Sequence, residues 1–158
     1  MTLSGSGEKI AVVVNASLQR AAELLGGSHD LVVLTGAGIS TESGIPDFRS
    51  PGGIWTKYDP QEFTYQNFVS NPAHRVRYWK MSLDIHPVLG AAEPNAAHRA
   101  VVELERQGRL RALITQNIDG LHQRAGSSPD RVIEIHGTAL SVVCLSCDDR
   151  STRDEVQA

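Results

Sequence analysis

The most constraining feature of this sequence is a short apolar run that breaks directly into glycines. Residues 31–34, LVVL, form a continuous apolar stretch, which predicts a strand covered on both faces of a parallel sheet. Glycines at the end of such a strand allow a sharp turn and the close approach of a ligand. A helix beginning near Ile39 would direct its free N–H groups toward the same place. The stretch therefore predicts a phosphate site at Gly36, Ala37 and Gly38, although a plain turn remains an alternative.

A loop rich in glycine, proline and serine follows, with the sequence SGIPDFRSPGG. It contains a carboxylate, an aromatic ring and a guanidinium, in Asp47, Phe48 and Arg49. Because a guanidinium can bind phosphate through two parallel hydrogen bonds, we expect this loop to close over a phosphate-bearing ligand. The spacing differs from the common dinucleotide fingerprint, since Thr41 stands where that pattern has glycine or alanine.

Two further apolar runs predict an α/β fold with a parallel sheet. Residues 110–115 and 131–135 have the composition of buried strands, and a short helix is expected between them at 121–125. Polar residues follow each strand, in the cluster 116–119 and at His136. Since ligands bind at the carboxyl ends of parallel strands, we expect these clusters and the first glycine turn to form one cleft.

The remaining segments are expected to be mainly helical. Apolar residues recur at helical spacing over 10–25, and residues 51–94 are expected to form short helices and loops that carry most of the aromatic side chains. Within that region a helix is predicted from Pro72 to about residue 85, with Pro87 marking a break. Asn95 is expected to cap the next helix.

Several polar residues in these clusters are candidates for catalysis. His136 suits proton transfer because its ordinary pKa lies near neutrality, and the glycine beside it leaves room for a substrate. Asn117 and Asp119 are either ligand-binding residues or turn formers. His98 and His122 are expected to be packed within the fold.

Composition and charge exclude several classes of function. The 158 residues suit one domain, and the net charge of −3 with a pI near 6.0 gives no electrostatic reason to expect nucleic acid or a membrane as a partner. No apolar run approaches the roughly 20 residues that span a bilayer. The N-terminus lacks a basic leader, so a signal peptide is not expected. We expect a soluble cytoplasmic protein.

Three blocks of sequence resemble the signatures of the sirtuins, the NAD-dependent protein deacylases. They are GAGIS with SGIPDFRS, then TQNIDGLHQRAG at 115–126, and EIHGT at 134–138. The resemblance implies a Rossmann-like, sirtuin-type sheet, NAD as cosubstrate and an acyl-lysine protein as substrate. It also implies that nicotinamide is released and that the acyl group is transferred to ADP-ribose, with His136 as the general base for a ribose hydroxyl.

The resemblance assigns roles to the other candidate residues. Asp47 and Asn117 are expected to hold the nicotinamide carboxamide, Gln116 a ribose hydroxyl, and Asp119 belongs to the same pocket, so that Asn117 and Asp119 are grouped with His136 as catalytic. The expected lining of the cofactor site is completed by Gly36, Ala37, Gly38, Ile45, Phe48, Arg49 and Ile118.

Two cysteines, Cys144 and Cys147, are spaced C-x-x-C, which places two thiolates on one turn as half of a tetrahedral zinc site. A redox pair or two ordinary thiols are the alternatives. The resemblance implies a structural zinc, but the second cysteine pair of the family is missing from this sequence. We therefore expect an incomplete zinc-binding module at 138–158.

The expected domain organisation follows from these assignments. Residues 1–9 are expected to be flexible, 10–137 to form the N-terminal part of a sirtuin NAD-binding domain, and 51–94 to be its helical cofactor-loop region. We expect the C-terminal part of the sheet to be missing.

The function expected from the resemblance is NAD-dependent lysine deacetylation. The Tyr-x-x-Arg pair that marks sirtuins with acidic acyl substrates is absent, which favours uncharged acyl groups. The alternatives are an NAD-binding fragment without catalysis and a mono-ADP-ribosyltransferase.

Overall fold

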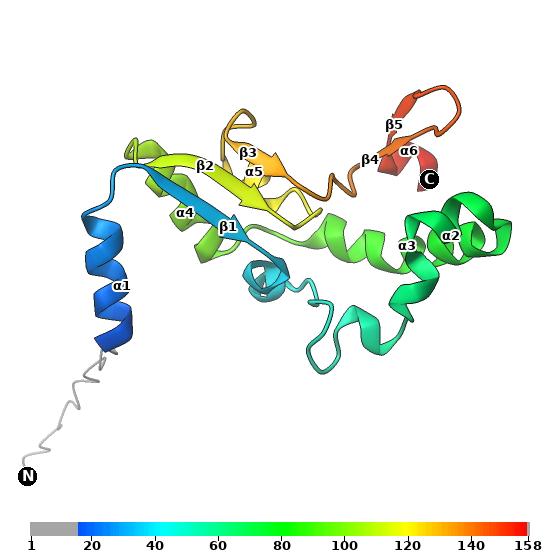
Figure 1. Cartoon of the computed structure of the whole chain (residues 1–158), viewed down its shortest axis with the longest axis horizontal. Coiled ribbons are helices and arrows are strands. Elements are labelled where there is room, and N and C mark those ends of the chain that lie inside the picture. Colours follow the sequence, from blue (N-terminus) through cyan, green and yellow to red (C-terminus); the bar gives the residue numbers. More distant parts are fainter. Residues whose placement is uncertain (1–15, 158) are drawn as a thin grey trace, which may run out of the picture.

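The computed structural model describes residues 16–157, and its centre is a three-stranded parallel sheet. The strands are β1 (Leu31–Thr35), β2 (Leu110–Thr115) and β3 (Val132–Glu134), with β2 in the middle. All three point toward the helical region of the molecule (Figure 1). The three predicted strands and the α/β class are confirmed.

One face of the sheet is covered by α4 (Ala96–Arg106), which lies behind it in Figure 1. Val101 of α4 packs against Leu110 and Leu113, and both of these leucines are buried. Leu31, Val33, Leu104 and Val132 complete this cluster. The amphipathic pattern of α4 therefore provides the main cover of the sheet.

The opposite face of the sheet is largely open to solvent. Val32 and Leu34, which point away from α4, are 55% and 64% exposed, and Ile133 on β3 is also exposed. Helix α1 (Ala16–Gly26) projects away from the sheet and exposes Leu18 (Figure 1). Since a parallel sheet is normally covered on both faces, residues 16–157 leave this face without the cover that α4 gives the other. The part of the predicted first helix at 10–15 lies outside the described residues.

Four short helices and one 20-residue helix separate β1 from α4, on the side of the carboxyl ends of the strands (Figure 1). The helix expected near Ile39 is the 3₁₀ helix η1 (Ala37–Ser43). It is followed by η2 (Ile54–Thr56), η3 (Pro60–Phe63), α2 (Tyr65–Ser70) and α3 (Pro72–Ala91).

The break predicted at Pro87 is wrong, because α3 continues through it to Ala91. Proline removes the hydrogen bond of its own nitrogen and crowds the carbonyl four residues before it, but Pro87 lies close to the end of the helix. The following turn still closes, since the Ala92 N–H donates to the Val88 carbonyl at 3.1 Å. A proline near a helix end thus costs too little to stop this helix.

The chain after β2 forms α5 (Leu121–Ala125), β3 and a small hairpin. Strands β4 (Ser141–Val143) and β5 (Arg150–Thr152) pair antiparallel, and α6 (Arg153–Gln157) follows. The hairpin lies above α2 and α3 in Figure 1. Among residues 16–157, no helix combines the length and the apolar character needed to cross a bilayer.

Two buried histidines form part of a polar chain beneath the strand ends. The Asn95 N–H donates to His98 Nδ1 at 3.3 Å, so the proton of this ring lies on Nε2. The Thr35 hydroxyl donates to Thr115 Oγ1 at 2.9 Å and therefore accepts from His122 Nε2, also at 2.9 Å. The two rings pack edge to face, 4.9 Å apart. In this arrangement of protons, Nε2 of His98 carries a hydrogen and can donate. Nδ1 of the adjacent His122 ring carries a lone pair and can accept.

Burial makes this pair sensitive to acid. Burial first, and then the charge of His98, lower the pKa of His122 to about 4. Burial also lowers the pKa of His98. A histidine whose pKa is lower in the folded state stabilises the fold above its unfolded pKa of about 6.5, and this stabilisation is lost as the pH falls toward the folded value.

We expect the free energy of unfolding to fall by roughly 3 kcal/mol between pH 6.5 and pH 4 because of His122, measured by urea denaturation at a series of pH values. Replacing the exposed His29 by glutamine should leave this pH dependence unchanged. A His122→Gln protein that stays folded should lose most of it, and an unchanged slope in that variant would contradict the assignment.

Asn95 should contribute more to stability than an ordinary cap. Its Oδ1 accepts from the Ala97 N–H at 2.9 Å, and its Nδ2 also donates to the Ile39 carbonyl at 2.7 Å and to Ser43 Oγ at 3.0 Å. Asn71 caps α3 through the Ala73 N–H. We expect Asn95→Ala to cost about 2–3 kcal/mol and Asn71→Ala about 1 kcal/mol in urea denaturation. Equal losses would show that the two bonds to η1 contribute nothing.

Candidate functional site

The exits of the three strands open into one cleft of about 740 Å³. It is formed by the turn after β1, the loop that follows η1, the exit of β2 and His136, the second residue after β3. Its lining consists of Leu34, Thr35, Gly36, Ala37, Gly38, Ile39, Asp47, Phe48, Arg49, Trp55, Gln116, Asn117 and His136. Segments that are about 100 residues apart in the sequence therefore share one site, as the strand order predicts.

The glycine turn leaves open space at the wall of the cleft. Gly36 has an extended backbone (φ −141°, ψ −175°) and precedes the first residue of η1. A Cβ atom added at Gly36 or Gly38 would meet no described atom within 4 Å outside its chain neighbours. Packing within residues 16–157 does not require glycine at these two positions. The space is therefore available to a ligand that approaches the backbone closely.

The loop beside the turn is closed by one carboxylate. Asp47 Oδ1 accepts from the backbone N–H groups of Arg49 and Ser50, at 3.0 and 2.8 Å, and Oδ2 accepts from the Ser50 hydroxyl. The bonds from Ser50 hold the pKa of Asp47 below its usual value. This carboxylate stays charged and fixes the part of the loop that carries Arg49.

A glycine allows the same loop to close on itself. A Cβ atom at Gly53 would lie 2.7 Å from the Asp47 carbonyl oxygen, closer than any side chain can approach. The Gly53 N–H donates to the Ser50 carbonyl at 2.7 Å. Phe48 packs on Trp55 with 5.3 Å between the ring centres, so the loop presents an aromatic wall to the cleft.

Ser40 joins η1 to the exit of β2. This residue is only 1% exposed, and its hydroxyl donates to Asp119 Oδ2 at 2.7 Å while it accepts from Asn117 Nδ2 at 3.0 Å. Asp119 Oδ1 accepts from the Leu121 N–H at 2.9 Å and so also holds the start of α5. Sequence reasoning missed Ser40. Its signal was a small polar residue on the inner side of a helix that follows a buried strand.

His136 follows β3 and reaches the exit of β2. Its Nδ1 lies 3.1 Å from the Gln116 carbonyl oxygen. Because a carbonyl can only accept, Nδ1 carries the proton and Nε2 holds a lone pair. The ring is exposed and lines the cleft, as a proton acceptor for a bound substrate must.

Three residues expected in the cofactor site do not line the cleft. Ile45 packs in the core with Leu89, Ala92 and Leu121. Ile118 lines a separate, smaller cavity. Asp119 is buried behind Ser40. The structure therefore places these three side chains behind the wall of the cleft.

The two cysteines lie on the turn between β4 and β5, and both are exposed free thiols. The backbone N–H groups of Ser146 and Cys147 donate to the sulfur of Cys144 and lower the pKa of this thiol. Such bonds favour the thiolate, which is the form that binds metals. Within residues 16–157, no group of three or more His, Cys, Asp or Glu side chains is placed to hold a metal. Two thiols alone are fewer than the four ligands that structural zinc requires.

We compared the sequence with family models and with known proteins, and the matches belong to one family. A sequence model of the Sir2 family matches residues 36–158. The chain is 50% identical over 133 residues to NAD-dependent protein deacylase 2 of Archaeoglobus fulgidus, covering 84% of this chain and 50% of the relative. It is 48% identical over 134 residues to an NAD-dependent protein deacetylase of Thermodesulfovibrio yellowstonii, covering 85% and 51%.

Solved structures agree with these relatives. A Sir2 homologue in complex with NAD superposes with a TM-score of 0.72 at 42% identity, covering 85% of this chain and 51% of that one. A Sir2 protein with a deacetylated peptide and an acetyl ADP-ribose superposes with a TM-score of 0.74 at 43% identity, covering 88% and 55%. The chain spans about half the length of the curated relatives it matches. From its sequence blocks, its fold and these matches, the chain belongs to the Sir2 family.

Proposed function

We propose that this chain supplies the nicotinamide and ribose half of the active site of an NAD-dependent protein lysine deacetylase. The observation that carries the proposal is the convergence of the glycine turn, the Arg49 loop, the β2 exit and His136 on one cleft. Each segment brings a different chemical group, and together they match the parts of a dinucleotide.

The glycine turn and Arg49 would hold the diphosphate. The open space at Gly36 and Gly38 lets phosphate oxygens approach the backbone, and the guanidinium would add a positive charge. Gln116, which lines the cleft at the exit of β2, would bind a ribose hydroxyl. Bound NAD would supply an electrophilic ribose carbon with nicotinamide as the leaving group.

The nicotinamide carboxamide would be held by Asn117. This side chain uses its Nδ2 to donate to Ser40, so Oδ1 is the atom with which it can accept from a carboxamide N–H. Asp119 acts indirectly, because it orients Ser40 and the start of α5. The Asp47 carboxylate accepts three bonds from its own loop and contributes to the site mainly by fixing the loop.

His136 would act as the general base. Its protonated Nδ1 is held by the Gln116 carbonyl, which orients the ring and leaves Nε2 to accept a proton from a ribose hydroxyl. The deprotonated hydroxyl would then be the acyl acceptor, and NAD, acyl-lysine and one water would give free lysine, nicotinamide and O-acyl-ADP-ribose. The absence of a Tyr-x-x-Arg pair from the sequence favours acetyl or another uncharged acyl group.

The cysteine pair would contribute to a structural zinc site. The backbone bonds to Cys144 favour its thiolate, and Cys147 follows on the same turn. Two further ligands must come from outside the described residues, since these residues hold no larger metal-binding group. The zinc would stabilise the hairpin and would take no part in the reaction.

The proposal is tested by nicotinamide release from NAD, measured with the purified chain in the presence and absence of an acetyl-lysine peptide. We expect release that requires the peptide and falls at least about 100-fold in His136→Ala, since a general base typically contributes 10²–10⁴ in rate. His29→Ala, which changes an exposed histidine outside the cleft, is the matched control and should keep full activity.

The alternatives give different outcomes in the same assay. Binding of NAD without release would contradict catalysis and favour an NAD-binding function alone. Transfer of label from NAD to protein, independent of acetyl-lysine, would favour ADP-ribosyl transfer. Faster turnover of a succinyl-lysine peptide than of the acetyl peptide would contradict the preference for uncharged acyl groups.

A further inference from the structure

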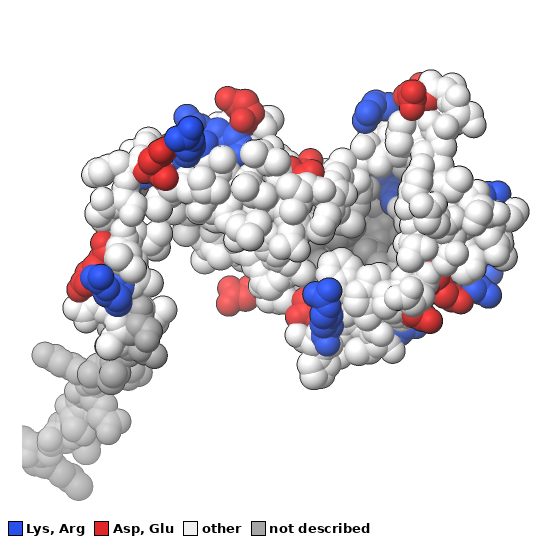
Figure 2. Space-filling view, viewed as in Figure 1, with Lys and Arg blue, Asp and Glu red and all other residues white. Residues whose placement is uncertain are grey.

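A second pocket, of about 360 Å³, lies between the β4–β5 hairpin and the α2–α3 region. It shares no lining residue with the NAD cleft. The space-filling view shows a hollow on this side of the hairpin (Figure 2). Its walls are mostly apolar and aromatic, formed by Phe63, Phe68, Tyr78, Trp79, Val142 and Leu145. The volume is within the range of small-molecule sites.

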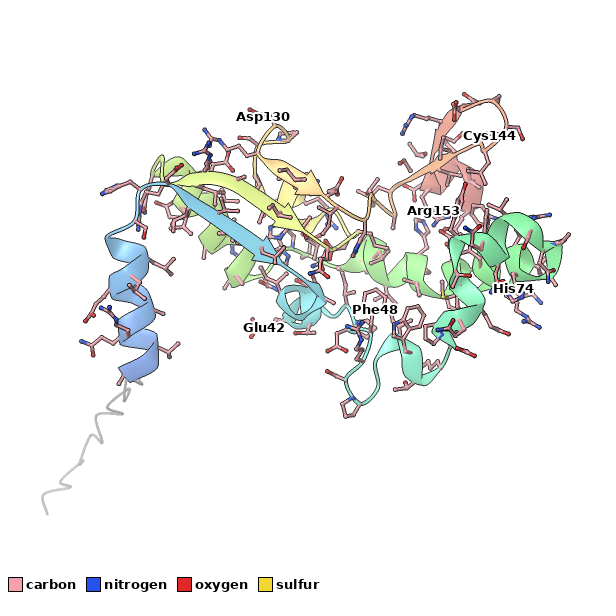
Figure 3. All side chains as sticks on the ribbon, viewed as in Figure 1. Glu42, Phe48, His74, Asp130, Cys144 and Arg153 are labelled. Carbon is pink, nitrogen blue, oxygen red and sulfur yellow. The ribbon has the colours of Figure 1, made fainter. Side chains whose placement is uncertain are left out.

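One cation lies in the wall of this pocket. Arg153, the first residue of α6, is only 7% exposed and lies beneath the hairpin, on the side that faces α3 (Figure 3). Its guanidinium carbon lies 5.0 Å from the centre of the Trp79 ring and 5.9 Å from that of Tyr78. Nε donates to the Ala139 carbonyl and Nη2 to the Tyr78 hydroxyl, both at 3.2 Å. The group is thus held rigidly by neutral partners.

The charge of Arg153 has no anionic partner among residues 16–157. None of the ion pairs in this part of the chain includes it, and both of its hydrogen-bond acceptors are uncharged. Burying a guanidinium without a counter-charge is unfavourable, and stacking on aromatic rings offsets only part of that cost. A guanidinium also has five N–H donors, more than the two bonds use. A carboxylate would complete the charge balance of this site.

We propose that this pocket binds a small-molecule carboxylate with an aromatic or short aliphatic body. The carboxylate would bond to the Arg153 guanidinium, and the body would pack on Phe68, Trp79 and Leu145. An inorganic anion would leave the aromatic walls unused, and a neutral apolar molecule would leave the charge unpaired. The combination of one fixed cation with aromatic walls therefore selects an amphiphilic acid.

The two tryptophans of the chain allow a direct test, because Trp79 lines this pocket and Trp55 the NAD cleft. The ¹⁵N-labelled chain gives one indole N–H signal for each, assigned with Trp79→Phe. We expect 3-phenylpropanoate to shift the Trp79 signal saturably and to leave that of Trp55 unchanged. The neutral 3-phenylpropanamide should bind at least about tenfold more weakly, as expected for loss of a charge-assisted bond.

Variants separate the role of the charge from that of folding. Arg153→Gln should bind the acid and the amide equally, whereas Arg153→Lys should keep a preference for the acid. Arg150→Gln, which removes an exposed arginine from the same hairpin, should behave like the parent chain. Equal binding of acid and amide by the parent chain would overturn the proposal even if Arg153→Gln fails to fold, and it would leave Arg153 as a tether between the hairpin and α3. A shift of Trp55 alone would overturn it as well.

Discussion

The Ser40 hydroxyl is the interaction on which the site depends. It bonds to Asn117 and Asp119, which follow β2, while Ser40 itself belongs to the helix after β1. These bonds are buried, so breaking one would leave a buried polar group without a partner, at a cost in free energy. They fix the distance between the glycine turn and the β2 exit. They add a direct link between the two walls of the cleft to the links made by the strands and by Asn95.

Buried polar bonds also join segments beneath the cleft, where Thr35 and Thr115 bond to each other at the ends of β1 and β2. His122 bonds to Thr35 from below, and Asn95 links α4 to η1. Polar groups thus connect the strand ends, whereas apolar packing against α4 holds the rest of the sheet. This division leaves the polar edge of the sheet available for a polar ligand, and it makes that edge sensitive to acid through the buried histidines.

Much of the fold was predictable, because long apolar runs and glycine turns are local signals. The signals that predict the strands, the Asn95 cap and the α5 helix all lie in neighbouring residues of the sequence. Pro87 was misjudged because its effect depends on its distance from the helix end. The positions of Ile45 and Ile118 depend on which side of the chain meets the core, and this requires tertiary contacts. The bonds of Ser40 and the neutral surroundings of Arg153 also join distant segments, so no local pattern reveals them.

The most direct test of the account is the affinity for NAD, measured by calorimetry on the parent chain and on Ser40→Ala. If the buried hydroxyl positions the two walls of the cleft, the parent chain binds NAD and the variant binds at least about tenfold more weakly, the equivalent of one lost buried hydrogen bond. Ser70→Ala, which removes an exposed hydroxyl from α2, should bind like the parent. A folded Ser40→Ala chain with unchanged affinity, or a parent chain that binds no NAD, would contradict the account.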